Sequence, residues 1–406
     1  MITIEEALSI VMDNTRRLDP CFLDITEAYG RVIAEDIYAT EDVPPFNNSA
    51  MDGFAIRFAD TLGASTVSPV TLEILEDLPA GKAKLTEVGK GQSIRIMTGA
   101  CMPKGADAVV MLEDVEEKEG SILVSGPISE KENVREAGED VRQGELVIPR
   151  DTVLGPAEIG LLASLGFSRI KTFAAPVVAI ISTGNELVEV GDTLTPGKIR
   201  NSNSYSLNAL VLKYGGIPYR LGIAADQEEV IRGKIEEALR ADLILTSGGV
   251  SVGDYDYVKM VAEKMGAKSH FWGVAMKPGK PLTFATIKGK PFFGLPGNPV
   301  AVMVSFEQFV RPAMLKMMGK QVLPLPEVEA ELQEEIRKKP GRTHFIRGLL
   351  TKGESGKYMV STTGPQGSNI LKSMVLANCL IVVSKEKTFL SKGESVKVQL
   401  LKEQSL

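Results

Sequence analysis

The sequence predicts a multidomain α/β protein whose central domain is a doubly wound α/β sheet. Between Pro176 and Met318, apolar strand-like runs alternate with helix-like segments, a spacing typical of parallel strands joined by crossover helices. Before this region, short alternating runs broken by Gly and Pro predict a β-rich domain inserted into a helical module. After it, a second set of such runs predicts a C-terminal β-barrel-like domain. A chain of 406 residues is long enough for several domains of this kind.

The first part of the chain is predicted to be helical. Thr3 and Glu6 form a capping-box pattern ahead of a helix over residues 3–18. Alternating runs between residues 67 and 147 indicate the inserted domain, and residues 154–165 indicate a return to helix. The patterns predict four parts: a helical module at 1–43 and 142–172, an inserted β-rich domain at 44–141, an α/β domain at 173–322, and a C-terminal β domain at 323–406.

The later elements follow from the same periodicity rules. In the α/β domain, strands are predicted at residues 177–182, 218–223, 242–246 and 291–294, and helices at 202–214, 227–240, 255–265 and 300–318. In the C-terminal domain, strands are predicted at residues 344–350, 358–362, 379–384 and 395–401.

The charge of the chain is divided unevenly along its length. The net charge is −6, but residues 1–172 carry 30 acidic and 16 basic residues, whereas residues 173–406 carry 22 acidic and 30 basic ones. The basic excess is too weak for a nonspecific nucleic-acid surface, so we expect no nucleic-acid partner. It suits a pocket for a small polyanion.

Composition also disfavours several classes of site. The chain has two histidines, His270 and His344, and three cysteines that are far apart, which disfavours a multi-histidine metal site, a thiolate zinc site and a disulfide framework. No apolar stretch is long enough to span a membrane, and the first residues lack the features of a signal peptide. We expect a cytoplasmic protein with no membrane partner.

Three Gly-rich loops follow predicted strands of the α/β domain, at residues 182–187, 247–256 and 294–299. Ligands bind outside the carboxyl ends of strands in open α/β sheets, so these loops predict a binding site. Gly248 and Gly253 have the spacing of a phosphate-binding loop, but Asp254 stands where an NTPase carries Lys. Backbone amides and a bridging Mg²⁺ would then hold phosphate, with Asp254 and Asp256 as oxygen ligands.

Two lysines on a Pro-rich turn reinforce the prediction of an anion site. Lys277 and Lys280 are natural counter-ions for phosphate. A nicotinamide site is disfavoured, because the only Gly-x-Gly pattern, which starts at Gly89, does not continue to the third glycine or open a helix.

Seven sequence motifs, spread over nearly the whole chain, occur in the same order as in a known family. They lie at residues 45–55, 96–99, 105–110, 182–187, 247–253, 277–281 and 294–299. Together they resemble the molybdopterin molybdenumtransferase (MoeA-type) family, which is related to the E domain of gephyrin. The resemblance implies a molybdopterin-binding-type third domain and a helical module for dimerisation. It also implies a homodimer whose active site lies between the third domain of one subunit and the second and fourth domains of the other.

The resemblance implies a reaction and its participants. The substrates would be molybdate and adenylylated molybdopterin, a pterin dithiolene joined through pyrophosphate to AMP. Mg²⁺-dependent cleavage of the pyrophosphate would accompany metal insertion and release AMP and molybdenum cofactor. The implied partners are a molybdopterin adenylyltransferase, which would supply the substrate, and molybdoenzymes, which would accept the product.

The resemblance, combined with the chemistry of the side chains, assigns roles to single residues. Mg²⁺ is expected to be held by Asp256, Glu186 and Asp226. The expected catalytic residues are these three together with Lys277, Lys280 and Asp52. Arg347 is the expected oxyanion contact, since a guanidinium forks onto tetrahedral anions. The expected substrate-binding residues are Thr98, Thr183, Gly184, Ser247, Gly248, Gly249, Ser251, Gly253, Pro296, Gly297, Asn298, Arg347 and Ser368.

Three alternatives stay open at this point. A molybdopterin adenylyltransferase shares the Gly-Gly-Val-Ser type of loop, but such proteins are usually far shorter. A gephyrin-like scaffold would use the dimer to hold other proteins and would need no acidic cluster beside the lysine turn. A tungstate-handling enzyme is the third, because this chain has Trp272-Gly273 where bacterial relatives often carry Trp-Lys.

Overall fold

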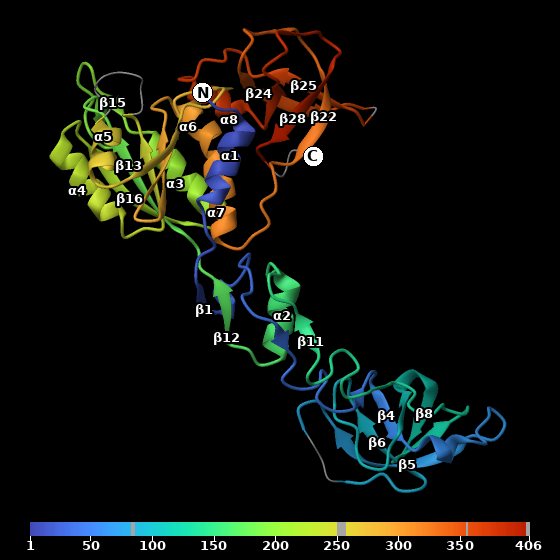
Figure 1. Ribbon diagram of the computed structural model, residues 1–406. Coiled ribbons are helices and arrows are strands. Elements are labelled where there is room, and N and C mark those ends of the chain that lie inside the picture. The colour runs from blue at the N-terminus through green and yellow to red at the C-terminus, as the bar shows by residue number, and fades with distance from the viewer. Residues whose placement is uncertain (83–85, 250–256, 355, 403–406) are drawn as a thin grey trace. The chain divides into compact units, whose positions relative to one another are not determined.

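The structure, a computed structural model, describes residues 1–82, 86–249, 257–354 and 356–402 (Figure 1). The chain forms two compact units, of which the first comprises Met1–Cys21, Gly30–Val32 and Thr172–Leu406, and the second comprises Phe22–Tyr29 and Ile33–Lys171. The chain crosses between them within β1 (Pro20–Asp24) and β12 (Arg169–Phe173), and again on either side of Gly30–Val32. This division is coarser than the four expected domains, whose boundaries stay a prediction. Among the described helices, none is long and apolar enough to cross a membrane.

The core of the first unit is a six-stranded sheet. Its strand order is β16 (Ile217–Ala224), β13 (Val177–Thr183), β17 (Leu243–Ser247), β21 (Lys290–Leu295), β20 (Thr283–Ile287) and β18 (Lys268–Trp272). The first four strands are parallel, as predicted. Strand β20 runs antiparallel to both of its neighbours, β21 and β18, and neither β20 nor β18 was predicted from the sequence. Lys288 and Gly289, both with positive φ, connect β20 to β21, and a two-residue turn can join only antiparallel neighbours.

Helices cover both faces of this sheet (Figure 1). One buried cluster joins one face to α3 (Asn203–Lys213), α6 (Pro299–Ser305), the π-helical segment Phe306–Val310 and α7 (Arg311–Met317). A second cluster joins the other face to α4 (Glu228–Ala238) and α5 (Tyr257–Lys264). The prediction of a doubly wound domain is therefore confirmed. The long helix expected over residues 300–318 is divided by the π-helical segment.

The N-terminal helix α1 (Ile4–Asp13) packs in the first unit and is shorter than predicted. The Glu6 amide donates to Thr3 Oγ1 at 3.1 Å, and the Thr3 amide donates to Glu6 Oε2 at 2.8 Å, so the capping box is present. Ala7 and Val11 are fully buried in the same cluster as α7. Helix α1 is thus anchored to the α/β domain by its apolar face.

The C-terminal domain is a closed five-stranded barrel. Its order is β24 (Thr343–Lys352), β25 (Tyr358–Thr362), β22 (Glu327–Leu332), β28 (Ser395–Leu400) and β26 (Cys379–Val383), which pairs again with β24. Strand β19 (Met276–Lys277) of the α/β domain pairs in parallel with the start of β24. Phe345, Met374 and Leu380 join the core cluster of the α/β domain. This apolar joint fixes the barrel against the α/β domain.

Smaller elements complete the first unit. They are the ribbon β14 (Leu187–Val188) with β15 (Ile199–Arg200), the ribbon β23 (Ile336–Arg337) with β27 (Phe389–Leu390), and helix α8 (Leu371–Leu376). The β23–β27 ribbon lies at the start of a basic segment that enters β24.

The second unit is built on another six-stranded sheet. Its order is β7 (Ala108–Met111), β4 (Gly53–Ile56), β6 (Gln92–Ile96), β5 (Val70–Leu78), β9 (Ser121–Val124) and β8 (Val115–Lys118). Two apolar clusters, around Phe54 and around Ile94, are buried in this sheet. The expected β-rich domain is present.

The remaining elements of the second unit are short apart from α2. They are helix α2 (Pro156–Ser164), the 3-10 turns Ile25–Glu27, Phe58–Thr61 and Leu112–Asp114, and the ribbons β2 (Ile37–Tyr38) with β11 (Leu146–Ile148) and β3 (Asn48–Ser49) with β10 (Val134–Arg135).

Candidate functional site

The carboxyl ends of three neighbouring strands meet at one edge of the α/β sheet. Ser182 in β13 is in register with Ser247 in β17, and Ser247 is in register with Leu295 in β21. The Gly-rich loops that follow these strands therefore start side by side, as the sequence predicts. Such an edge is where open α/β sheets bind ligands.

Two glycines pack tightly against Thr183 at this edge. Gly248 and Gly249 have φ of +93° and +65°. A Cβ on Gly248 would collide with the Thr183 carbonyl oxygen, and one on Gly249 would lie 2.9 Å from Thr183 Oγ1. Only glycine fits both the backbone conformation and the space. Thr183 Oγ1 is buried and has no hydrogen-bond partner among the described residues, so it is available to a ligand.

Asn203, in the first turn of α3, ties two of the loops together. Its Nδ2 donates to Ser247 Oγ at 2.9 Å and to the Gly297 carbonyl oxygen at 2.7 Å. Its Oδ1 is buried without a partner in the described part of the chain. Asn203 was not among the site residues predicted from the sequence. The only sequence signal for it was the polar Asn-Ser-Asn run over residues 201–203, which follows a loop at the same edge.

The expected metal ligands are only partly described. Asp226 is half-buried, and its Oδ2 accepts the Asn185 amide at 3.2 Å, while the Asp226 amide donates to Asn185 Oδ1 at 3.1 Å. Glu186 is exposed, and no described residue bonds its carboxylate. Carboxylate oxygens are the donors that Mg²⁺ prefers, so this donor set fits that ion.

The third expected ligand is Asp256. Asp256 lies outside the described residues, as do Ser251, Gly253 and Asp254. Among the described residues, no group of three or more His, Cys, Asp or Glu side chains is arranged to hold a metal. The metal triad stays a prediction.

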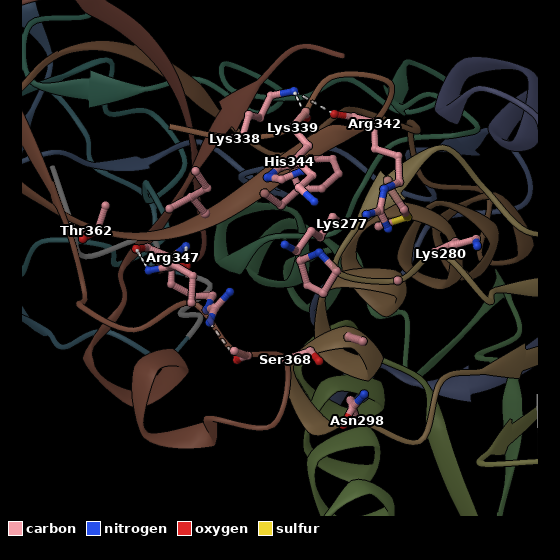
Figure 2. A pocket seen from close by; sticks show the side chains of 18 of the residues that line it. Lys277, Lys280, Asn298, Lys338, Lys339, Arg342, His344, Arg347, Thr362 and Ser368 are labelled. Atoms are coloured by element: carbon pink, nitrogen blue, oxygen red, sulfur yellow. Dashed lines mark hydrogen bonds between the residues drawn. The ribbon is translucent and has the colours of Figure 1, made fainter. Parts of the chain in front are cut away.

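A pocket of about 1150 Å³ opens between the α/β domain and the barrel (Figure 2). Pro296 and Asn298 line it, so it adjoins the loop that Asn203 holds. Its wall is strongly cationic. The basic lining residues are Lys277, Lys280, Arg337, Lys338, Lys339, Arg342 and Arg347, and the acidic ones are Glu334 and Glu335. The excess of cations makes this a pocket for a polyanion.

The turn that carries Lys277 and Lys280 is rigid at its centre. Gly279 has a φ of +109°, and a Cβ there would lie 2.8 Å from both Met276 Cε and Ser305 Oγ. The turn is therefore fixed against buried neighbours, while both lysine side chains are exposed toward solvent. Point charges on a fixed turn are suited to holding an anion in the adjoining pocket.

Arg347, in β24, is a buried cation without a carboxylate partner in the described structure. Its side chain is 1% exposed. Nε donates to Ser373 Oγ at 3.0 Å, and one terminal nitrogen donates to the Gly367 carbonyl oxygen at 2.9 Å. Burial lowers the pKa of Arg347 to about 10. A buried guanidinium with only neutral partners is costly, and an anion in the pocket would offset that cost.

Ser368 and Asn298 lie near each other on the pocket wall (Figure 2). The Val300 amide donates to the Ser368 carbonyl oxygen at 3.1 Å, which joins the loop after β25 to helix α6. Ser368 is half-buried and Asn298 is exposed. Lys277, Arg347, Ser368 and Asn298, which sequence analysis placed in separate motifs, thus line one pocket.

Four basic pocket residues lie in a segment that the sequence analysis did not select. They are Arg337, Lys338, Lys339 and Arg342. Lys338 Nζ donates to the Arg342 carbonyl oxygen at 3.0 Å, which holds the segment in a turn. The dense run of basic residues was visible in the sequence, but only the barrel brings it to the pocket.

Asp52 and Thr98 belong to the second unit and are directly bonded. The Thr98 amide and hydroxyl both donate to Asp52 Oδ1, at 2.7 and 2.8 Å. These bonds, the amide first, lower the pKa of Asp52, because they favour its charged form. Both side chains are exposed, so the pair presents a fixed carboxylate to solvent.

The fold and these contacts define a class: a multidomain α/β protein with a glycine-loop edge beside a cationic pocket, suited to a phosphorylated or oxyanionic ligand. Three family models match the chain, described as MoeA N-terminal region (domain I and II) at residues 2–166, Probable molybdopterin binding domain at residues 179–316, and MoeA C-terminal region (domain IV) at residues 329–401. The chain belongs to the molybdopterin molybdenumtransferase (MoeA) family.

Individual relatives agree with this assignment over the full length. The chain is 38% identical to the molybdopterin molybdenumtransferase of Haemophilus influenzae, over 98% of each chain. It is 35% identical to that of Staphylococcus aureus strain COL, over 98% of this chain and 95% of the relative. The crystal structure of the molybdopterin biosynthesis MoeA protein from Pyrococcus horikosii matches with a TM-score of 0.84 and 33% identity, over 99% of each chain.

Proposed function

We propose that this protein is a molybdopterin molybdenumtransferase that inserts molybdate into adenylylated molybdopterin, with Mg²⁺-dependent release of AMP, in molybdenum cofactor biosynthesis. The single observation that carries the proposal is the buried Arg347 guanidinium. It has only neutral partners in the described structure and lies in a cationic pocket that adjoins the glycine loops. The names of the relatives support the same activity.

The pocket and the sheet edge divide the binding of substrates between them. Arg347, Lys277 and Ser368 hold the tetrahedral oxyanion, since a guanidinium and an ammonium complement its charge. The backbone of Gly248 and Gly249, with Thr183 Oγ1, holds phosphate oxygens of the nucleotide part. Asn203 keeps the Ser247 and Gly297 loops at a fixed separation, which positions one ligand against the other.

Cleavage of the pyrophosphate needs stabilisation of developing negative charge. Lys277 and Lys280 supply fixed positive charge at the pocket. Glu186 and Asp226, with Asp256, are the residues that would hold Mg²⁺. When bound, the ion supplies Lewis-acid stabilisation of the phosphate oxygens.

The proposal includes an oligomeric state, a cellular location and partner enzymes. A homodimer would let the Asp52 and Thr98 pair of one subunit complete the pocket of the other. The reaction would take place in the cytoplasm, between a molybdopterin adenylyltransferase and the molybdoenzymes that accept the cofactor.

The activity is tested with purified protein, adenylylated molybdopterin, molybdate and Mg²⁺. We expect AMP release together with cofactor that activates a cofactor-free molybdoenzyme, and we expect Arg347→Met to lower both by about tenfold or more at limiting molybdate. Pyrophosphate release from ATP and molybdopterin would instead identify an adenylyltransferase. Absence of either reaction, with an intact dimer on sizing, would identify a scaffold.

Tungstate in the same assay tests the remaining alternative. Gly273 has a φ of +84°, a backbone conformation that favours glycine over a residue with a side chain. Equal or faster turnover with tungstate would assign the protein to tungsten.

A further inference from the structure

His344 occupies an unusual position in the cationic pocket. It lies in β24, in register with Lys277 of β19 on one side and Val383 of β26 on the other. It is 8% exposed and lines the pocket. Figure 2 shows it between Lys277 and the basic segment that carries Lys338 and Lys339. No described residue forms a hydrogen bond with its ring.

The charges that face His344 are nearly all positive. Lys277 comes from β19, Lys338 and Arg342 come from the segment before β24, and β26 presents the uncharged Val383. Farther along the pocket wall lie Lys280, Lys339, Arg337 and Arg347, with the carboxylates Glu334 and Glu335. Glu386 also acts on Lys338. In the free protein, a proton on His344 would add a further cation to this cluster.

Burial and these cations lower the pKa of His344 to about 4, with burial the larger cause. The ring is therefore neutral in the free protein at neutral pH. A dianion bound in the pocket reverses the sign of the local potential, because it places two negative charges among the same cations. The ring nitrogens have no partner in the described structure and are free to donate to that anion once protonated.

We propose that His344 takes up a proton when a tetrahedral dianion binds in the pocket, so that anion affinity is coupled to pH. This inference rests on the proposed function, which places a tetrahedral oxyanion in this pocket. Protonated His344 then joins Lys277 and Arg347 as a cation around the ligand. The coupling makes the pocket hold a dianion more tightly in mildly acidic solution and release it more readily as the pH rises.

Thermodynamic linkage gives the size of the effect. Between the pKa of His344 in the free protein and its pKa in the complex, affinity changes by about tenfold per pH unit, and about one proton is taken up per anion. Sulfate is the appropriate probe, because it stays a dianion over the whole range and does not itself take up protons. Any proton uptake then belongs to the protein.

The test is calorimetric titration of sulfate into the full-length protein in two buffers with different ionisation enthalpies. We expect about one proton taken up per sulfate in mildly acidic solution. His344→Gln should still bind sulfate but lose the proton uptake and the pH dependence. His270→Gln is the matched control, because the chain has only these two histidines and His270 bonds Thr286 Oγ1 at 3.0 Å, away from the pocket lining.

Nuclear magnetic resonance of the histidine rings checks the same point directly. With His270→Gln, one ring signal remains, and its pKa should rise on addition of sulfate. A signal that does not shift its pKa, or proton uptake that persists in His344→Gln, overturns the inference. Circular dichroism of His344→Gln confirms that the variant is folded.

The outcomes separate this inference from the proposed function. Sulfate binding without proton uptake, in a protein that still releases AMP, overturns the role of His344 alone. Failure of sulfate to bind the wild-type protein overturns both the proton coupling and the assignment of Arg347 as oxyanion contact. If sulfate binds with proton uptake and Arg347→Met weakens that binding by about tenfold or more, both the role of His344 and the assignment of Arg347 are supported.

Discussion

Gly249 lies so close to Thr183 that a Cβ on the glycine would be 2.9 Å from Thr183 Oγ1. The same residue has a φ of +65°. The close approach brings the backbone of the loop after β17 against the end of β13, where Thr183 Oγ1 is buried without a hydrogen-bond partner among the described residues. A side chain at position 249 would therefore crowd both Thr183 Oγ1 and Val258 Cγ2, which would lie 2.8 Å from its Cβ.

Gly249→Ala should reduce catalytic efficiency by at least about tenfold, because the loop must move to relieve the contact and backbone amides then lose their alignment. Steady-state AMP release is the measurement. Gly266→Ala is the matched control, since Gly266 also has a positive φ, of +87°, but has open space around its Cβ position. If both variants lose activity equally, backbone strain and not the contact with Thr183 is responsible.

Arg347→Met should weaken oxyanion binding by about tenfold or more, which corresponds to the loss of charge-assisted hydrogen bonds of roughly 1.5–3 kcal/mol. The melting temperature should change little, because removal of a buried charge with only neutral partners is offset by the loss of the donors to Ser373 Oγ and the Gly367 carbonyl oxygen. Sulfate titration and thermal unfolding measure the two effects. Arg337→Met, at an exposed pocket residue paired with Glu335, should affect binding much less.

Asn203→Ala should lower the free energy of unfolding by about 1–2 kcal/mol, since Ser247 Oγ and the Gly297 carbonyl oxygen lose their common donor. The affinity for the nucleotide part should fall as well, because the two loops are no longer tied together. Urea unfolding and AMP binding measure these changes. Asn208→Ala, in the same helix, is the control; a larger loss of stability or AMP binding in that variant would contradict the role of Asn203.

The free protein should lose stability as the pH falls from about 6.5 toward 4, because unfolded His344 accepts a proton that the folded chain rejects. Because the pKa of His344 is lower in the folded protein, the loss of stability begins as the pH falls below the pKa of the unfolded histidine. It ends near the pKa of the histidine in the folded protein. Unfolding measured across this range should show a weaker slope in His344→Gln. His270→Gln removes a second, smaller contribution, since burial also lowers the pKa of His270.

Thr98→Val should raise the pKa of Asp52 only part of the way to its ordinary value, because the amide bond, the larger cause, remains. The stability that this pair contributes is present above the ordinary pKa of 3.8 and is lost as the pH falls through the lowered folded value. Carboxyl resonances followed by nuclear magnetic resonance measure the shift. Thr98→Ser, which keeps the hydroxyl, should leave it unchanged; an equal rise in both variants would contradict this explanation.

Local patterns were sufficient to predict the helices and the parallel strands of the doubly wound domain. Alternation of strand and helix fixed the doubly wound domain, and the Thr3 and Glu6 pair marked the start of α1 correctly. Neither β18 nor β20 was predicted, and periodicity in a strand carries no information about the direction in which β20 runs beside β21. That direction followed from a two-residue turn at Lys288 and Gly289.

The candidate site was predictable only in part. Glycine loops and the lysine turn could be identified because their function depends on backbone conformation and charge, which are local properties. Asn203 and the buried state of Arg347 could not, since each depends on residues from distant segments packing around it. The expected ligands Glu186 and Asp226 follow neighbouring strands, whereas their joint role with Asp256 stays a prediction.

The uneven charge of the chain separates what the sequence determined from what only the tertiary structure decided. The sequence by itself determined that residues 173–406 carry the basic excess and that glycine loops end the strands of an α/β sheet. Only the tertiary structure decided that Lys277, Arg342, His344 and Arg347 line one pocket. The physical reason is that closure of the barrel and its apolar joint with the α/β domain place β24 beside β19, a contact between segments more than sixty residues apart that no local pattern encodes.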